Sequence, residues 1–465
     1  MCETAVMKKN IQGTSTVVGA IDPDVLSFTV GKDPVLDLDL AEWDCIGSAA
    51  HATMLSKMKF KPRIFSVEER NAVVVELAKI AEDARTGRFV ITEADQDCHL
   101  AIERTLTERL GDLGRRVHTG RSRNDQVAVD LRLYGRDQLF GVYDEALDLV
   151  ESIVRFAKRH TDLPMVGRTH LQPAMPSSVA LWISTYAEAL LDDLFSVDAA
   201  FTLNNRCPLG SAAGYGVPLP IDRQLTSDLL AFDAPVHNVI YASVARGKCE
   251  AVTLNALAAI MVTLSRLAED LILYSMPEFG YFSLPKAFCT GSSIMPQKYN
   301  PDVCELLRAK AARVLASANG TMEILRAMPG AYNRDLQETK ELYIEGFRTT
   351  RAALRIMARL IGGLQANPDK LRAGFSPAVF ATDRALQLVA GGMPWRDAYH
   401  QVRDHLEDLS MMDPDAALAA KTHLGATAGL DLGLYDLQVH ERRHEVADEK
   451  KRVDKAVAKL FRPLR

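Results

Sequence analysis

The sequence predicts an all-α protein built around a central bundle of long helices, with smaller helical domains before and after it. Three observations support this. Apolar residues recur three or four apart over long stretches, sustained β alternation is scarce, and 465 residues exceed the roughly 250–300 that one hydrophobic core serves. We therefore expect an N-terminal domain over residues 1–125, a bundle over 126–370 and a C-terminal domain over 371–465. The first forty residues are expected to form an irregular arm.

Five stretches carry the helical pattern. Residues 127–160 place apolar side chains on one face and Asp and Arg on the other, which is typical of a long amphipathic helix. A second helix is expected after Pro176. Residues 247–276 are rich in Leu and Ala on most faces, so we expect that helix to be buried around most of its perimeter. Residues 304–328 and 342–364 complete the bundle.

Composition narrows the class of protein. Hydrophobic residues make up 48% and charged residues 25%, and the net charge is −5 with both signs interspersed, so we expect neither nucleic acid nor a membrane as a partner. No signal-peptide pattern opens the chain, and seven scattered cysteines without Cys-x-x-Cys spacing indicate reduced thiols in the cytoplasm. No metal-ligand cluster, phosphate-binding glycine loop or dinucleotide fingerprint is recognisable, so no metal or cofactor is expected.

One segment has the composition of a loop that binds or acts on a ligand. Residues 291–302 read Gly-Ser-Ser-Ile-Met-Pro-Gln-Lys-Tyr-Asn-Pro-Asp, which is too polar and too broken to be core. Pro296 prevents a smooth helix there, and Pro301 suits the start of the next one. The loop can bring the hydroxyls of Ser292 and Ser293, the cation of Lys298 and backbone N–H groups to one anion. The alternative is an ordinary surface turn, which the same residue types often build.

This string resembles the signature loop of the fumarase/aspartase superfamily. Residues 118–126, His-Thr-Gly-Arg-Ser-Arg-Asn-Asp-Gln, resemble the signature of the argininosuccinate lyase family within it, and the likeness runs from about residue 44 to 402. The resemblance implies the superfamily's long helical bundle in a cofactor-free homotetramer, with active sites shared between three chains. It also implies reversible β-elimination of 2-(N(omega)-L-arginino)succinate to L-arginine and fumarate, the last step of arginine biosynthesis.

The resemblance assigns roles by position. Ser292 matches the catalytic base, Lys298 would stabilise the carboxylate that takes up carbanion charge, and His170, oriented by Glu305, would assist the departing nitrogen. The residues implied to bind substrate are Ser122, Arg123, Asn124, Thr169, Tyr332, Gln337, Lys340, Arg246 and Asn300. Each has a simpler alternative: Ser122 as a helix cap, His170 at a helix entry, Glu305 at a helix dipole, and the segment around Tyr332 as a solvated helix face.

The chain departs from the family pattern in three places. Tyr299 stands where a second lysine is usual, the N-terminus lacks a Trp-Gly-Gly-Arg-Phe-like opening, and residues 238–250 replace an acidic stretch. All three bear on the leaving group more than on the elimination. Two alternatives therefore stand beside argininosuccinate: another N-substituted aspartate as the substrate, or a non-catalytic, crystallin-like structural role.

Overall fold

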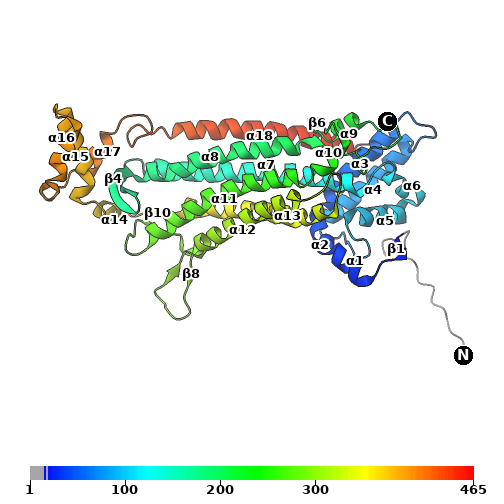
Figure 1. Ribbon diagram of the computed structural model, residues 1–465, viewed down its shortest axis with the longest axis horizontal. Helices are drawn as coiled ribbons and strands as arrows, with labels where there is room; N and C mark the ends of the chain where they lie inside the picture. Colours follow the sequence, from blue (N-terminus) through cyan, green and yellow to red (C-terminus); the bar gives the residue numbers. More distant parts are fainter. Residues whose placement is uncertain (1–14, 17–18, 465) are drawn as a thin grey trace.

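The computed structural model describes residues 15–16 and 19–464 and is an elongated body in which long helices run side by side (Figure 1). The predicted all-α class is confirmed, because the strands are short pairs and helices form the core. The five bundle helices are α7 (Arg123–Arg159), α8 (Val179–Asn204), α11 (Lys248–Ser275), α12 (Asp302–Arg326) and α13 (Thr339–Gly363). Each covers its predicted stretch to within a few residues.

Helix α11 lies at the centre of the bundle. It packs against α8, α12 and α13, while α7 packs against α8 and α13. An 18-residue stretch of α11 has a mean hydropathy of 1.6, enough by length and composition to cross a membrane, but most of that stretch is buried against the other helices. The expected burial of this helix is confirmed, and its apolar character is explained by its place in the core.

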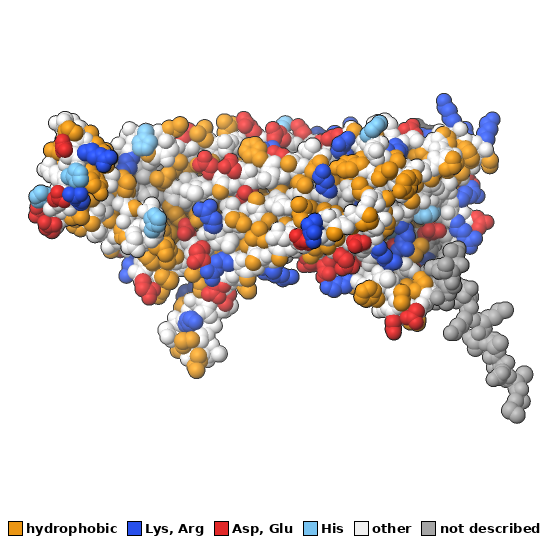
Figure 2. Space-filling model, in the orientation of Figure 1, with side chains coloured by type: hydrophobic (Ala, Val, Ile, Leu, Met, Phe, Trp, Pro, Cys, Tyr) orange, Lys and Arg blue, Asp and Glu red, His pale blue; other side chains and the backbone are white. Residues whose placement is uncertain are grey.

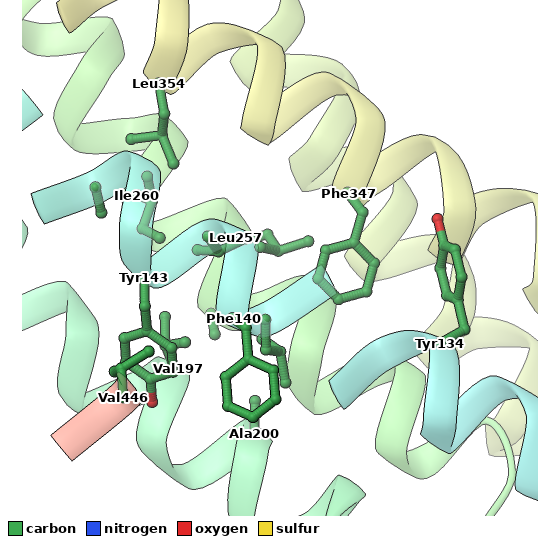
Figure 3. Close-up of a cluster of buried hydrophobic side chains, with 14 of the residues drawn as sticks. Tyr134, Phe140, Tyr143, Val197, Ala200, Leu257, Ile260, Phe347, Leu354 and Val446 are labelled. Carbon is green, nitrogen blue, oxygen red and sulfur yellow. The ribbon is translucent and has the colours of Figure 1, made fainter. Parts of the chain in front are cut away.

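Aromatic side chains join α7 to its neighbours (Figure 3). The ring centroids of Phe140 and Phe201, on α7 and α8, lie 5.3 Å apart. Tyr134 meets Phe347 of α13 edge to face at 5.9 Å. Buried aromatic pairs of this kind add about 0.5–1.5 kcal/mol each beyond the area they bury, so they help to fix the bundle that carries the functional loops.

One end of the molecule holds the N-terminal helices. These are α1 (Pro23–Val30), α2 (Asp33–Leu36), α3 (Ala41–Lys57), α4 (Val67–Arg85), α5 (Cys98–Leu110) and α6 (Asp112–Arg115). The expectation of an irregular arm is wrong for residues 23–39, which form α1, α2 and a 3₁₀ turn, η1 (Asp37–Asp39). Asp22 caps α1 by accepting two backbone N–H groups, and Pro23 occupies the first helical position. Residues 1–14 and 17–18, the rest of the expected arm, lie outside the described residues, as does Cys2.

Helices α14 (Pro368–Ala373), α15 (Ala381–Ala390), α16 (Trp395–Arg403) and α17 (Pro414–Ala419) gather at the opposite end (Figure 1). The last helix, α18 (Gly433–Leu460), runs back along the bundle and packs against α7 and α3. Arg70 of α4, 1% exposed, donates to the carbonyl oxygens of Leu460 and Arg462. The final turn of the described chain is thereby joined to the N-terminal helices.

The remaining elements are short. The helices and 3₁₀ turns are α9 (Arg223–Leu229), α10 (Val239–Val244), η2 (Arg116–His118), η3 (Lys286–Phe288), η4 (Arg334–Glu338), η5 (Pro377–Phe380) and η6 (Leu406–Asp408). The antiparallel pairs are β1 (Ser15–Thr16) with β2 (Gly19–Ala20), β3 (Pro164–Thr169) with β4 (Gln172–Ser178), β7 (Phe282–Ser283) with β10 (Gln365–Ala366), and β8 (Thr290–Gly291) with β9 (Tyr299–Asn300). Strands β5 (Arg206–Cys207) and β6 (Ala234–Pro235) pair in parallel. The six cysteines within the described chain are free.

Candidate active site

The expected site residues fall into three groups within one chain. The first group lines a cavity at the N-terminal end of the bundle, the second lies on the β3–β4 hairpin at the other end, and the third lies on the projecting β8–β9 hairpin and the start of α12 (Figure 1). The second and third groups lie toward the same end of the long axis, and the first group lies toward the other end (Figure 1). A single chain therefore does not bring the expected base, Ser292, to the cavity that holds most of the expected binding residues.

The first group surrounds a cavity of about 200 Å³. Six expected residues line it, namely Arg123, Asn124, Arg246, Tyr332, Gln337 and Lys340. Four more residues complete the lining: Asp33, Asp97, Val127 and Arg334. The wall therefore carries four cationic side chains and two carboxyl groups, which suits a ligand that bears several negative charges and at least one positive charge.

The N-terminus of α7 forms one side of the cavity. Ser122 caps this helix, since its Oγ accepts the N–H of Asn124 at 3.3 Å and its own N–H donates to Asp125. The simpler interpretation of Ser122 as a helix cap is thus realised. Arg123 forms an ion pair with Asp97 of α5, and Asp97 Oδ1 also accepts the N–H of Leu100 at 3.0 Å. Both Asp97 oxygens are therefore engaged within the protein.

Lys340 is a buried cation that pairs with two carboxylates beside the cavity. Its side chain is 2% exposed, and Nζ lies 2.5 Å from Asp37 Oδ1 and 3.1 Å from Asp33 Oδ1. Burial works against its charge, but the two carboxylates outweigh burial and raise the pKa of Lys340. Burial raises the pKa of Asp33 to about 6, and the Lys340 charge offsets only part of that effect. Sequence reasoning missed Asp33, because an acidic residue at the start of a short helix is ordinary.

Arg246 and Gln337 close the cavity from the bundle side. Arg246 is 5% exposed; its Nη2 donates to the carbonyl of Leu336 at 3.1 Å, while its Nε has no hydrogen-bond partner among the described residues. Gln337 Nε2 donates to the carbonyl oxygen of Thr29 at 2.9 Å, which joins η4 to the end of α1. A buried guanidinium with an unused donor is suited to a carboxylate ligand.

The second group occupies a tight turn. Thr169 and His170 are exposed at the tip of the β3–β4 hairpin, and His170 and Leu171 have φ values of +54° and +60°. Positive φ at both central positions is typical of a two-residue hairpin turn and costs a non-glycine residue about 1–3 kcal/mol. His170 therefore does not sit at a helix entry, and the turn presents its imidazole outward.

A cavity of about 1020 Å³ lies behind this hairpin, between β3, β4 and helices α15 and α17. Thr169 contributes to its lining, but most of the other lining residues are apolar or small. His170 is not among the lining residues.

The third group projects from the body (Figure 2). Ser292 Oγ accepts the backbone N–H groups of Ile294 at 3.3 Å and Met295 at 3.1 Å. Hydrogen bonds donated to this oxygen favour its deprotonated form, which a serine acting as a base requires. Lys298 lies on the same hairpin, and its charge is among the causes that lower the pKa of Asp302, after the hydrogen bond from Thr290.

The base of the projecting hairpin is tied down by side chains. Asp302 accepts hydrogen bonds from the N–H and the hydroxyl of Thr290, and Asn300 Nδ2 donates to the Thr290 hydroxyl at 3.4 Å. Glu305 lies in the first turn of α12 and is exposed. Ile294 at the tip is 83% exposed. The tip of the hairpin therefore exposes a large apolar side chain.

Behind the cavity lies a buried cluster that sequence reasoning also missed. Four possible metal ligands, Asp44, Cys98, His99 and Asp130, have ligand atoms within 4.8 Å of one another. They come from three helices, α3, α5 and α7, so no local spacing reveals them. Burial works against the charge of Asp44, but its ion pair with His99, followed by the charge of Arg121, outweighs burial and lowers the pKa of Asp44. Both carboxylate oxygens of Asp130 lack a hydrogen-bond partner among the described residues. The cluster packs the helices that carry Arg123 and Asp97.

Comparison with known proteins shows the family of the chain. The family model described as lyase matches residues 31–316. Argininosuccinate lyase of Parabacteroides distasonis is 42% identical over 85% of this chain and 86% of its own length, and that of Xanthomonas campestris is 41% identical over 89% and 95%. The chain therefore belongs to the lyase family, and within it to the argininosuccinate lyases.

Solved structures share the fold. EDDS lyase in complex with formate superposes with a TM-score of 0.79 at 24% identity, covering 98% of this chain and 97% of that one. Class II fumarase from Schistosoma mansoni gives a TM-score of 0.69 at 17% identity, covering 86% and 98%. At these identities the likeness concerns the fold alone, and it agrees with the helical bundle described above.

Proposed function

We propose that the protein cleaves 2-(N(omega)-L-arginino)succinate into L-arginine and fumarate, and runs the reverse addition when fumarate is abundant. The observation that carries this proposal is the cavity in which Arg123, Asn124, Arg246, Gln337 and Lys340 converge. A substrate with three carboxylates and a guanidino group needs a wall of this mixed charge. The name shared by the curated relatives supports the same substrate.

In this proposal, the steps of the elimination are carried out by residues from the three groups of the candidate site. Ser292, as an alkoxide held by two backbone N–H groups, takes the proton beside a succinyl carboxylate, and the carbanion charge spreads onto that carboxylate. Lys298 and the hairpin amides stabilise this charge. The bond between carbon and nitrogen then breaks, the electron pair leaves with the guanidino nitrogen, and His170, oriented by Glu305, assists its protonation.

This division requires several copies of the chain. The groups lie far apart within one chain, and the β8–β9 hairpin extends away from its own body (Figures 1 and 2). A homotetramer whose bundles pack together, with each site formed by three chains, would bring them together. Such an assembly would also cover Ile294 and the exposed apolar side chains of α12. We place this assembly in the cytoplasm, consistent with the scattered free thiols.

The direct test is to mix purified protein with argininosuccinate, follow fumarate by ultraviolet absorbance and quantify arginine. Equal amounts of the two products are expected. If fumarate is released only from other N-substituted aspartates, one of these compounds, and not argininosuccinate, is the substrate. A folded oligomer inactive on the whole panel would favour a structural role. Molar mass from light scattering, at a concentration where activity is measured, tests the tetramer.

A further inference from the structure

The buried cluster shared by α3, α5 and α7 contains a carboxylate without a partner. His99 of α5 contacts Asp44 of α3 directly through Nδ1, whereas Oδ2 of Asp130, on α7, lies 3.6 Å from the same nitrogen, longer than a hydrogen bond. Asp130 is 1% exposed, and neither of its oxygens has a hydrogen-bond partner among the described residues. Because a buried carboxylate is normally paired or coordinated, these oxygens indicate a bound water molecule or cation.

The charges around the cluster leave room for a cation. Two neighbouring carboxylates are already neutralised by ion pairs of their own, namely Asp37 with Lys340 and Asp97 with Arg123. Among the described residues, the cation left to Asp44 and Asp130 is Arg121, whose charge acts on both. That guanidinium is also shared with Glu103 and Asp125. One guanidinium thus faces several carboxylates, and a bound cation would balance the remaining negative charge.

The ligand types in the cluster are those that zinc prefers. Cys98 is completely buried, and its Sγ lies 3.9 Å from Nδ1 of His99. A sulfur, a nitrogen and two carboxylates therefore have ligand atoms within 4.8 Å of one another. Tetrahedral zinc, with bonds of about 2.0–2.3 Å, places its ligand atoms roughly 3.3–3.8 Å apart. The spacings of Cys98 and Asp130 from His99 are close to this range, and an ion would replace the proton shared in the shorter contact of His99 with Asp44.

The cluster has little space for anything besides an ion. The cavity that borders Asp44, His99 and Gln126 has a volume of about 10 Å³, which is about enough for one water molecule. A metal ion in the cluster would therefore be held mainly by protein side chains, as in structural zinc sites, and not by an exchangeable substrate.

We propose that Asp44, Cys98, His99 and Asp130 bind one divalent transition-metal ion of the zinc type, which joins α3, α5 and α7. Binding forms one bond from the ion to sulfur, one to nitrogen and two to oxygen, and the protons of the thiol and of the contact between imidazole and carboxylate leave to solvent. The ion supports the start of α7, which lines the candidate site. The expectation that the chain takes no metal rests on local spacing, which cannot reveal ligands from three helices.

Cobalt(II) provides the test, because a bond between cobalt and a thiolate absorbs in the near ultraviolet and identifies the sulfur ligand. Tag-free, full-length protein is stripped with a chelator, dialysed and titrated with Co²⁺. The absorption should saturate at one equivalent per chain. It should be lost in Cys98→Ala, and Asp130→Asn should need at least about 10-fold more Co²⁺. Cys45→Ala is the matched control: Cys45 is an equally buried thiol on α3, it is not one of the four ligands, and its removal should leave the titration unchanged.

Zinc should also raise the melting temperature of the stripped wild type and of Cys45→Ala by a few degrees, and should not raise that of Cys98→Ala, since an ion that binds only the folded state stabilises it. A wild-type protein without absorption from a cobalt–thiolate bond would overturn the proposal even if the variants fail to fold, and would assign the oxygens of Asp130 to bound water. Undiminished absorption in Cys98→Ala would overturn it as well. These measurements need no substrate, so their outcome is independent of the proposed function.

Discussion

The ammonium of Lys340 and the carboxylate of Asp37 lie 2.5 Å apart although 303 residues separate them in the sequence. Both side chains are almost completely buried, so each charge relies on the other. The pair joins the start of α13 to η1 and holds one side of the candidate site.

Lys340→Met should therefore lower stability as well as activity. Removing one partner of a buried ion pair costs about 3–5 kcal/mol, because the remaining charge is uncompensated. Adding Asp37→Asn should restore most of the free energy of unfolding and none of the activity, as measured by denaturant titration and fumarate release. Recovery of activity in the double variant would contradict a binding role for Lys340.

Ser292→Ala should abolish most fumarate release while the oligomer and its melting temperature stay unchanged. The expected loss in kcat is on the order of 10²–10⁴, the range typical of a positioned base. The neighbouring hydroxyl provides the control, because Ser293→Ala removes a similar group and should reduce activity much less. A Ser292→Ala protein with near-normal kcat would refute the assignment of the base.

Two inactive variants should restore activity to each other if the groups come from different chains. His170→Asn changes an exposed hairpin residue and Ser292→Ala a half-buried one on the projecting hairpin, so both variants should fold. When the two are dissociated together and reassembled, mixed oligomers should contain some sites free of either change. Activity that stays absent, although native mass spectrometry finds mixed oligomers, would contradict shared sites.

Gly135 lies in α7 where an added Cβ would be 1.9 Å from the hydroxyl of Tyr343. Tyr343 is completely buried and cannot swing away, so Gly135→Ala should destabilise the protein by about 1–3 kcal/mol despite the better helix propensity of alanine. Gly362 of α13 has open space where an added methyl group would lie, so Gly362→Ala should be neutral or stabilising by up to about 1 kcal/mol. The melting temperatures of the two variants, compared with that of the wild type in thermal unfolding, test both predictions.

His118 should make the protein less stable in mild acid. Burial, followed by the charge of Arg121, lowers its pKa from 6.5 to about 4 in the folded state. Above pH 6.5 the imidazole is neutral in both states and contributes no pH dependence. Between pH 6.5 and 4 only the unfolded state takes up the proton, so stability falls as the pH falls through this window. His118→Gln should reduce the drop in melting temperature across it; an unchanged drop would assign the effect to other groups.

The bundle could be predicted from the sequence because helical periodicity is local. Every stretch of α7, α8 and α11 carries its own apolar face, and caps such as Ser122 mark where helices begin. The projecting hairpin could also be located, since Pro296 and the glycine before the serines exclude a helix.

The position of Asp33 in the cavity wall could not be predicted, because it depends on contacts with residues that are distant in the sequence. Nothing in the segment around it shows that Lys340 has a second, closer carboxylate in Asp37. The same holds for the cluster of Asp44 and His99, whose helices meet only in the folded chain. The turn that holds His170 at positive φ was hidden for a different reason, because its residues have no strong preference for that conformation.

The hydrogen bonds from Arg70 to the carbonyl oxygens of Leu460 and Arg462 join segments that are synthesised at very different times. The two sides of this contact are 390 and 392 residues apart, so α3 and α4 leave the ribosome long before their final partner exists. Until residue 462 emerges, the guanidinium of Arg70 can donate to Thr53 and Asn71 but lacks the two carbonyl acceptors at the other end of the contact. The N-terminal helices should therefore pack less tightly on the nascent chain until residues 460–462 have emerged, and protection by a chaperone should be most valuable before that point.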